Sequence, residues 1–411
     1  MSAASLRVDV ARLQWRLDQL ALKGAIDGGG CCRLALSEED KAGRDLVVSW
    51  MRELGLDVAI DPVGNVFGWR AGIEDSAPVM TGSHIDTVRT GGRYDGTLGV
   101  LAGLEAVATL NDARITTRRP LVVAFFTNEE GTRFVPDMFG SLVYAGGLSL
   151  DAALATASVD GHTVGEELAR IGYAGDAPLG IYRPHSFVEL HIEQGPILDS
   201  EGVTIGAVQD LQGISWQEVA IGGQSNHAGT TPMRYRHDAG YCAAAIGVFL
   251  RELARKLGGA QVCTMGQVDL HPNLINVIAA TARVGVDLRN TADATLRAAE
   301  VELAAFLEDL AGAEGVSIQA RYLVRLAPVT FDAKIAGLVE QVASRLGHSP
   351  RRMTSGAGHD AQMLARVCPA GMIFVPSVDG ISHNVAEHTH AADIGAGANV
   401  LLHTLLELAG S

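Results

Sequence analysis

The pattern of apolar and polar positions divides the chain into two kinds of region. In the flanking regions, helical apolar spacing over residues 5–23, 38–54 and 97–110 alternates with short apolar runs at 57–60, 65–69 and 78–82. Three further runs, at 121–126, 186–192 and 370–376, have the pattern of strands buried on both faces of an α/β sheet. We therefore predict one large α/β domain with helices on both faces of its sheet.

The middle of the chain follows a different order. Residues 213–222, 261–269, 281–289 and 316–325 have strand-like patterns, and residues 238–256 and 293–312 have helical ones. Strict alternation over 281–289 indicates a strand with one exposed face. The order βαββαβ is the split βαβ, ferredoxin-like arrangement of a small α+β domain. We expect residues 212–328 to form a domain inserted into a larger one, made of residues 1–211 and 329–411.

Composition agrees with a folded protein of more than one domain. The chain has 411 residues, and a single core stops growing at roughly 250–300. Its net charge of −15 disfavours binding to nucleic acid or to anionic membranes. No stretch approaches 18 uninterrupted apolar residues, the N-terminal segment has no apolar core of a signal peptide, and the five cysteines lack zinc-finger or thioredoxin-like spacing. We expect a cytoplasmic protein with reduced thiols that binds neither nucleic acid nor membranes.

Four segments that follow predicted strands carry histidines and acids. They are GSHIDTVRTGGRYDG (82–96), TNEEGTRF (127–134), HIEQG (191–195) and SHNVAEHT (382–389). Each segment alone also fits a capped or solvated loop. Because the carboxyl ends of parallel strands meet at one edge of an α/β sheet, we expect the four segments to converge. Three histidines with two carboxylates suit one or two divalent ions of the zinc class, with an open position for water.

The set is large enough for two ions. Asp95 would bridge them at the usual separation of roughly 3.5–4 Å. His84 and His191 would complete one ion, and an acid of the second segment would join His383 on the other. A water between the ions would be acidified toward a pKa of ~7.

The adjacent acids Glu129 and Glu130 would repel each other unless a cation lies between them or they have different tasks. We expect one to bind metal and the other to act as a base, and spacing alone leaves open which does which. Asp86 lies two residues after His84, where its carboxylate is expected to fix the ligating imidazole.

Together with GGQSNHAGTTPM (222–233) and TSGAGHDA (354–361), these segments resemble the signature blocks of a known family. It is the di-metal amidohydrolase family of N-carbamoyl-L-amino acid hydrolases, allantoate amidohydrolases and β-ureidopropionases, within the aminoacylase-like metallopeptidases. The blocks occur in family order between about residues 82 and 390, and His191 stands where peptidase relatives carry an acid. The resemblance implies a zinc-exopeptidase-like catalytic domain and an inserted lid domain that carries a homodimer interface.

The resemblance also implies roles for individual residues. The implied metal ligands are His84, Asp95 (bridging), Glu130, His191 and His383. Glu129 would be the catalytic base, and His227 would stabilise the oxyanion across the dimer. The implied substrate contacts are Gln194, His227, Asn276, Arg289 and the backbone at Gly358. A guanidinium fork at Arg289 suits a substrate carboxylate, whereas His359 and Asp360 would shape their loop.

The expected activity is metal-dependent hydrolysis of linear amide or ureido C–N bonds. An N-carbamoyl-L-amino acid amidohydrolase would release the amino acid, CO2 and ammonia. Allantoate, which also combines ureido groups with a carboxylate, is the near alternative. Two divalent ions per subunit are expected, zinc or else manganese, cobalt or nickel. A non-catalytic small-molecule binding protein on the same fold is the alternative of a different class, and the intact Glu129–Glu130 pair argues against it.

Overall fold

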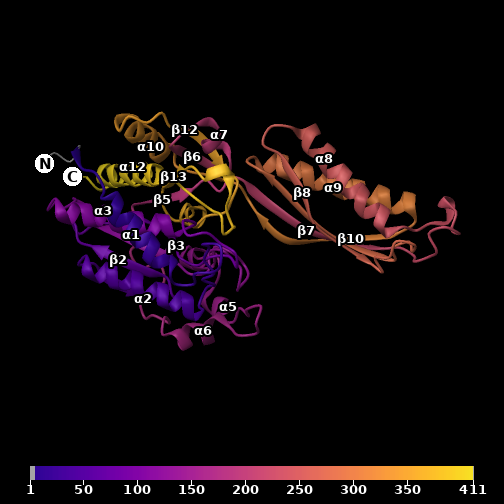
Figure 1. Cartoon of the computed structure of the whole chain (residues 1–411), viewed down its shortest axis with the longest axis horizontal. Helices are drawn as coiled ribbons and strands as arrows, with labels where there is room; N and C mark the ends of the chain where they lie inside the picture. The colour runs from indigo at the N-terminus through magenta and orange to yellow at the C-terminus, as the bar shows by residue number, and fades with distance from the viewer. Residues whose placement is uncertain (1–4, 411) are drawn as a thin grey trace. The chain divides into compact units, whose positions relative to one another are not determined.

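The computed structural model describes residues 5–410 and divides into two compact units (Figure 1). The larger unit is Met1–Gln209 with Phe331–Ser411, and the smaller unit is Asp210–Thr330. These boundaries differ from the expected ones by two residues at each junction. The coarse expectation of a mixed α/β fold is confirmed.

The larger unit contains the flanking elements of the chain. Its strands, with those at the junctions, are β1 (Asp57–Ile60), β2 (Val66–Arg70), β3 (Val79–His84), β4 (Leu121–Phe126), β5 (Ser186–Ile192), β6 (Gly206–Leu211), β11 (Val329–Thr330), β12 (Arg351–Ser355) and β13 (Ala370–Val375). Its helices are α1 (Val10–Ala21), α2 (Glu38–Glu53), α3 (Thr97–Asp112), α4 (Phe139–Tyr144), α5 (Leu150–Leu154), α6 (Val164–Ile171), α7 (Ile197–Glu201), α10 (Ala333–Arg345), α11 (Asp360–Leu364) and α12 (Ala391–Ala409).

Within residues 5–410, nine strands form one mixed sheet in the order β1-β2-β4-β3-β5-β13-β6-β11, with β12 paired to β6. The four central strands β4, β3, β5 and β13 run parallel, and the outer pairs are antiparallel. Every residue of these four strands is buried, as their continuous apolar runs predict. Their carboxyl ends therefore lie along one edge of the sheet.

Helices cover both faces of this sheet. A Cβ at Gly371 of β13 would lie 2.4 Å from Ile335 of α10, and a Cβ at Gly397 of α12 would lie 2.5 Å from Val375 of β13. The intervening residue Phe374 contacts the ring of His359, directly before α11, at a centroid distance of 5.6 Å. Because alternate residues of a strand point to opposite faces, α10 and α12 cover one face and α11 covers the other.

Local caps explain where the observed ends differ from the predicted ones. α1 begins at Val10 rather than residue 5, because the Asp9 side chain caps it by accepting from the Arg12 N–H at 3.0 Å. α2 begins where predicted, after Ser37, whose side chain accepts from the Asp40 N–H. β3 continues two residues past the predicted end because pairing with β4 extends to His84.

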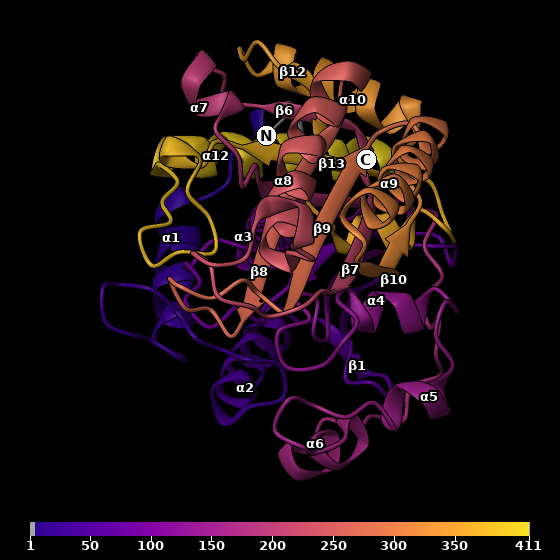
Figure 2. The same ribbon diagram turned by 90° about the vertical axis from the view of Figure 1, so that its right-hand side faces the viewer.

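The smaller unit has its own sheet and core. In residues 210–330, all of which the structure describes, the elements are β7 (Gly213–Gly222), α8 (Ala239–Leu257), β8 (Val262–His271), β9 (Thr281–Asn290), α9 (Asp293–Glu314) and β10 (Ser317–Leu326), with a 3-10 turn at Met233–Tyr235. Neighbouring strands are antiparallel, and their order in the sheet is β10-β7-β9-β8. In Figure 2 this order runs from right to left.

Alternation along β9 separates the two faces of the smaller sheet. Ala282, Val284, Val286 and Leu288 are buried in a core shared with α8 and α9, whereas the residues between them are partly or fully exposed. α8 is capped by Asp238, whose side chain accepts from the N–H groups of Gly240 and Tyr241. One face of the sheet is thus covered by helices and the other is open.

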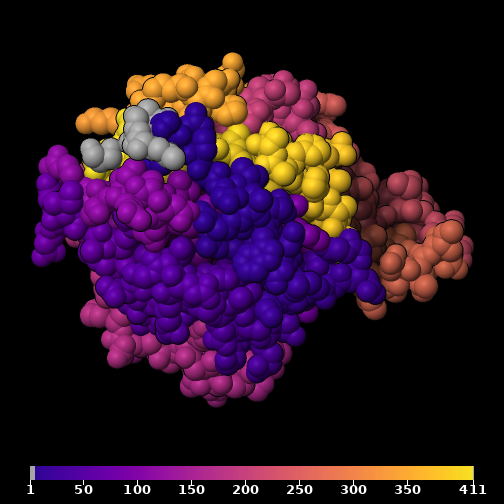
Figure 3. All heavy atoms as spheres, turned by 60° about the vertical axis from the view of Figure 1, so that its left-hand side comes forward, coloured from indigo at the N-terminus to yellow at the C-terminus, as the bar shows by residue number. Residues whose placement is uncertain are grey.

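The two ends of the described chain lie beside each other on the larger unit (Figure 3). The Val8 N–H donates to Asn399 Oδ1 at 3.0 Å, and the ring of His403 hydrogen-bonds to the Leu6 carbonyl at 3.1 Å. Among residues 5–410, none of the helices combines the length and the apolar character needed to cross a membrane.

Candidate metal centre

Residues from four strand ends meet at one edge of the larger sheet. His84 is the last residue of β3, the Glu129–Glu130 pair follows β4, and His191 is the penultimate residue of β5. Asp95 lies in the loop that precedes α3, and His383 lies in the loop that follows β13. The structure brings together all five expected ligands and the expected base.

The two carboxylate oxygens of Asp95 face different partners. Oδ1 lies 3.5 Å from His84 Nε2 and 3.2 Å from His191 Nε2, whereas Oδ2 lies 3.2 Å from His383 Nε2. Glu130 Oε2 lies 3.3 Å from the same His383 nitrogen. His84, Asp95 and His191 therefore form one ligand group, and Asp95, Glu130 and His383 form a second. A carboxylate shared by two such groups has the arrangement of a bridging ligand.

Main-chain carbonyls fix the tautomers of two of these histidines. His84 Nδ1 lies 3.0 Å from the Asp86 carbonyl oxygen, and His191 Nδ1 lies 2.9 Å from the Ile192 carbonyl oxygen. Because a carbonyl can only accept, each Nδ1 carries the proton in the neutral ring and each Nε2 keeps a lone pair on the side of the site; the lone pair of His191 accepts from the Gly96 N–H at 3.1 Å. This is the form of imidazole that binds a metal ion.

Asp86 positions the site through two different groups. Its carboxylate accepts from the backbone N–H groups of Glu129 (3.2 Å) and Glu130 (3.3 Å) and lies 3.9 Å from His84 Nδ1. The contact expected between this carboxylate and the His84 ring is thus made at shorter range by the Asp86 main chain, while the side chain holds the acid pair.

The buried acids have the electrostatics of a cation site. Burial, with the Asp95 carboxylate beside it, raises the pKa of Glu130 to about 8, and burial also raises the pKa of Glu129 well above its usual value. Bonding to Asp95 raises the pKa of His383 to about 9. Glu130 Oε1 is buried without a hydrogen-bond partner in the described chain. Divalent cations would offset the repulsion between the Glu130 and Asp95 carboxylates and would bind the unpaired oxygen of Glu130. These residues therefore fit such ions.

Gly96 is required by the close packing of this centre. Its φ of +63° lies in the left-handed region, and a Cβ there would lie 2.3 Å from His84 Nε2. A larger residue would displace the His84 ring from the position that faces Asp95.

Two of the expected substrate contacts lie in the larger unit. Gln194 donates from Nε2 to Asp95 Oδ2 at 2.8 Å, and its buried Oε1 has no partner among the described residues. Its carbonyl oxygen can therefore accept a hydrogen bond from a ligand N–H. Gly358 lies in the turn before α11, next to His359, whose ring packs against that of His191 at 4.5 Å between centroids.

The other expected substrate contacts belong to the smaller unit. His227 and Asn276 lie on two loops joined by a bridge between residues 227 and 277 and by the Ala228 N–H, which donates to the Asn276 carbonyl at 3.0 Å. His227 Nδ1 accepts from the Gly229 and Thr230 N–H groups, so its exposed Nε2 carries the proton and can donate to an oxyanion.

Arg289 lies away from that pair of loops. It is near the opposite end of β9, and eight residue steps of about 3.3 Å put its backbone about 26 Å from Thr281, where the strand begins. Its guanidinium already pairs with Asp287, with Nη2–Oδ2 at 2.9 Å. Within one chain, Arg289 and His227 therefore cannot contact the same small substrate.

Sequence reasoning missed two buried acids near the centre. Glu189 of β5 accepts from the Ser83 hydroxyl at 2.5 Å and from the Ala361 N–H at 2.8 Å. It also forms a third candidate group with His191 and His359, but its oxygens are already satisfied by these bonds. The signal was a charged residue inside a buried strand. The second acid, Glu387, lies in the SHNVAEHT segment, four residues after the predicted ligand His383.

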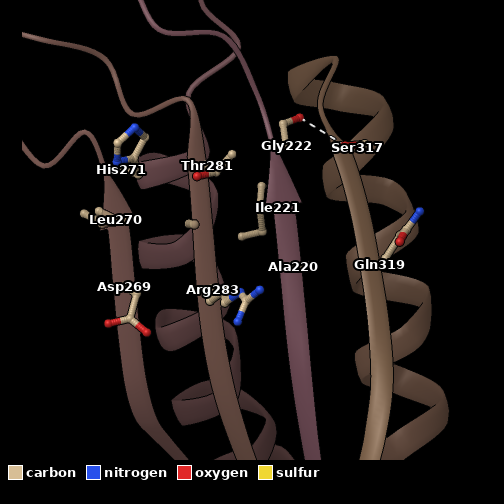
Figure 4. A pocket seen from close by; sticks show the side chains of 11 residues that line it. Ala220, Ile221, Gly222, Asp269, Leu270, His271, Thr281, Arg283, Ser317 and Gln319 are labelled. Carbon is tan, nitrogen blue, oxygen red and sulfur yellow. Dashed lines mark hydrogen bonds between the residues drawn. The ribbon is translucent and has the colours of Figure 1, made fainter.

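A pocket on the smaller unit is of a different kind (Figure 4). It lies on the open face of the sheet, where β7 contributes only Ala220, Ile221 and Gly222. Its charged lining is Asp269 and Arg283, with the imidazole of His271 nearby. Within residues 5–410, none of the groups of potential metal ligands falls among its lining residues.

Comparisons with known proteins agree on one family. The profile described as "Peptidase family M20/M25/M40" matches residues 80–407. An N-carbamoyl-L-amino-acid amidohydrolase of Rhizobium meliloti is 41% identical, over 98% of this chain and 97% of its own. The allantoate amidohydrolase of Escherichia coli K12 is 35% identical over 96% of both chains. The crystal structure of an amidase of the hydantoinase/carbamoylase family from Burkholderia multivorans superposes with a TM-score of 0.95 at 46% identity, over 99% of each chain.

Proposed function

The chain belongs to peptidase family M20/M25/M40, and we propose that it is an N-carbamoyl-L-amino acid amidohydrolase. The observation that carries the proposal is the Asp95 carboxylate, which lies between two groups of ligands at the carboxyl edge of the sheet. Relatives that match nearly the whole chain are named for this activity, at 41% and 39% identity. An amidohydrolase acting on C–N bonds other than peptide bonds accounts for both observations.

Two divalent ions would be held, one by His84, Asp95 and His191 and the other by Asp95, Glu130 and His383. When bound, such ions polarise a carbonyl oxygen and lower the pKa of a coordinated water. Zinc, manganese, cobalt and nickel all suit these nitrogen and oxygen ligands.

Glu129 would move the proton. It is buried, its Oε2 lies 3.4 Å from His84 Nε2, and it belongs to neither ligand group that includes Asp95. Its raised pKa is the property required of a carboxylate that accepts a proton from water and passes it to a leaving nitrogen. The Asp86 carboxylate holds the main chain of this acid in place.

The substrate would be recognised by Gln194, Arg289 and His227. The Oε1 of Gln194 would accept from a ureido N–H, and the Arg289 fork would bind the carboxylate of the amino acid. His227 would donate from Nε2 to the developing oxyanion, a contribution of roughly 2.7–4 kcal/mol for one donor. This assignment explains how a chain of net charge −15 binds an anionic substrate.

The separation of Arg289 from His227 favours a homodimer in which His227 and Asn276 complete the site of the partner subunit. Exposed apolar side chains occur around the edge strand β8 and helix α8, as an interface between two copies requires. They are Tyr241, Val248, Val262, Val268, Leu274 and Ile275. We place this dimer in the cytoplasm, where its five free thiols would stay reduced.

Allantoate is the second candidate substrate. Allantoate amidohydrolases of Escherichia coli and Bacillus subtilis match at 35% and 34% identity, and allantoate also combines ureido groups with a carboxylate. The same Gln194 and Arg289 contacts would serve it.

A substrate panel tests the proposal. The metal-loaded protein would be assayed for ammonia release from N-carbamoyl-L-amino acids, their D-enantiomers, allantoate and β-ureidopropionate. The proposal requires the highest kcat/KM on an N-carbamoyl-L-amino acid. A higher value on allantoate would move the assignment to the second candidate, and no ammonia from any substrate would refute both.

A further inference from the structure

Glu387 joins the two loops that carry Asp95 and His383. We call residues 91–96 the Asp95 loop and residues 381–389 the His383 loop. Glu387 Oε1 accepts from the backbone N–H groups of Tyr94 (3.1 Å) and Asp95 (3.2 Å), and Oε2 accepts from the Ser382 hydroxyl at 2.9 Å. The same hydroxyl lies 3.4 Å from Asp95 Oδ2. The buried Glu387 carboxylate therefore fixes the main chain of Asp95 and the side chain of Ser382, which is the neighbour of His383.

The Asp95 loop is shaped to receive this carboxylate. A Cβ at Gly92 would lie 2.1 Å from Glu387 Oε1 and 2.4 Å from its Cβ, so any side chain at Gly92 would displace Glu387. The φ of Gly92 is not in the left-handed region, so the glycine is needed for space rather than for backbone conformation.

The His383 loop also needs external support. His383 has a φ of +53°, in the left-handed region, which is unfavourable for a residue with a Cβ. A ligand on a strained backbone keeps its direction only if surrounding bonds hold the loop. The Ser382–Glu387 hydrogen bond spans this residue, and the other oxygen of Glu387 ties the loop to the main chain of Tyr94 and Asp95.

We propose that Glu387 is a positioning residue that sets the spacing between Asp95 and His383 and thereby the affinity for one cation, the one held by Asp95, Glu130 and His383. The inference rests on the metal centre proposed above. His84 and His191 are fixed instead by strand pairing and by carbonyls of their own segments, so the other cation depends less on Glu387.

Metal titration of the full chain tests this selectivity. Protein stripped with a chelator would be titrated with Zn²⁺ by calorimetry, with bound metal counted after equilibrium dialysis. For Glu387→Ala we expect one ion to bind about 10- to 100-fold more weakly than in the unaltered protein, and the other ion to keep its affinity. Equal weakening of both ions, or no weakening of either, would overturn the proposal.

Milder variants keep the test valid if Glu387→Ala fails to fold. Gly92→Ala leaves Glu387 in the chain but takes its space, so it should weaken the same ion. Glu387→Gln retains an oxygen for the two N–H groups and should have a smaller effect than Gly92→Ala. Wild-type affinities in a folded Gly92→Ala protein would contradict the proposal.

Asp332 supplies a matched control. Its carboxylate also accepts two backbone N–H groups, from Lys334 (2.8 Å) and Ile335 (3.1 Å), at the start of α10 in the same unit. Asp332→Ala should lower the melting temperature without changing either metal affinity. If Asp332→Ala weakened metal binding as much as Glu387→Ala, the effect of Glu387→Ala would be explained by general destabilisation, and the proposal would fail. If the unaltered protein bound no ion, the proposed centre itself would fail, which this design distinguishes from failure of the Glu387 inference.

Discussion

Replacing Glu129 by Gln separates the base from the metal ligands. The amide has the size of the carboxylate, and the Glu129 main chain stays bonded to Asp86. Glu129 belongs to neither ligand group that includes Asp95. The variant should therefore keep its metal ions while it loses the group that accepts and returns the proton.

The size of the loss follows from the proton-transfer task. A positioned general base contributes about 10²- to 10⁴-fold to the rate, which corresponds to about 2.7–5.4 kcal/mol at 1.36 kcal/mol per factor of ten. We expect kcat to fall by this factor and KM to change little, because Glu129 is not assigned a contact with the ground-state substrate.

Stability gives an independent check on the same variant. Burial raises the pKa of Glu129 in the folded state. In the metal-free protein, ionisation of Glu129 therefore lowers the free energy of unfolding as the pH rises above the pKa that this residue has in the unfolded chain. Gln carries no charge. Metal-free Glu129→Gln should therefore melt no lower than the metal-free unaltered protein at neutral pH.

The assay combines ammonia release, metal content and melting temperature, with Glu130→Gln as the matched control. Glu130 Oε2 faces His383 at 3.3 Å, so Glu130→Gln should lose metal as well as turnover. The assignment of the two acids would be refuted if Glu129→Gln lost metal as Glu130→Gln does, or if its kcat stayed near the wild-type value.

Three further outcomes are expected. Dialysis against a chelator should abolish ammonia release, and Zn²⁺ or Mn²⁺ should restore it; activity that survived verified removal of metal would contradict the proposed centre. Arg289→Ala should raise KM for carboxylate-bearing substrates and change kcat less, whereas equal losses on an uncharged ureide would exclude carboxylate binding. Glu105→Ala should destabilise folding by about 3–5 kcal/mol, because it leaves the buried Arg16 without the carboxylate 3.3 Å away; thermal melting should show this at unchanged metal content, and a melting temperature like that of the unaltered protein would show that the pair adds nothing.

Elements could be predicted from the sequence where the order of apolar and polar residues follows from which side chains are buried. β9 was predicted from its alternation, and β4 from its continuous apolar run. The same pattern led to the prediction that His84, Asp95, His191, His383 and one of the two adjacent acids converge, whereas the choice of Glu130 rather than Glu129 as the ligand came only from the family resemblance. The short helices α7 and α11, of five residues each, were not predicted because they are too short to show helical periodicity.

Contacts between distant segments were beyond the sequence pattern. Glu387 bonds to the main chain of a residue 292 positions earlier, and nothing in either local segment indicates the other. The tautomers of His84 and His191 depend on main-chain carbonyls, which every residue carries and no sequence pattern marks. The ion pair of Arg289 with Asp287 is different, because both residues lie on the face that alternation predicts to be exposed and a surface salt bridge is the ordinary role of an arginine there.

The residues proposed to hold metal and most of those proposed to bind substrate belong to different units of the chain, which has a consequence for specificity. All groups proposed to hold metal lie in the larger unit, at the ends of buried strands or in the loops that follow them, whereas Arg289, Asn276 and His227 lie in the smaller unit. Arg289 lies near one end of β9, and the loops that carry Asn276 and His227 lie at the other end. A small substrate can therefore contact Arg289 and His227 together only if a second copy of the chain supplies one of the two. Changes in the smaller unit should therefore alter which substrate is accepted and leave metal affinity unchanged. It follows that the proposed metal centre is compatible with either N-carbamoyl amino acids or allantoate as the substrate, and that the residues around the substrate carboxylate would decide between them.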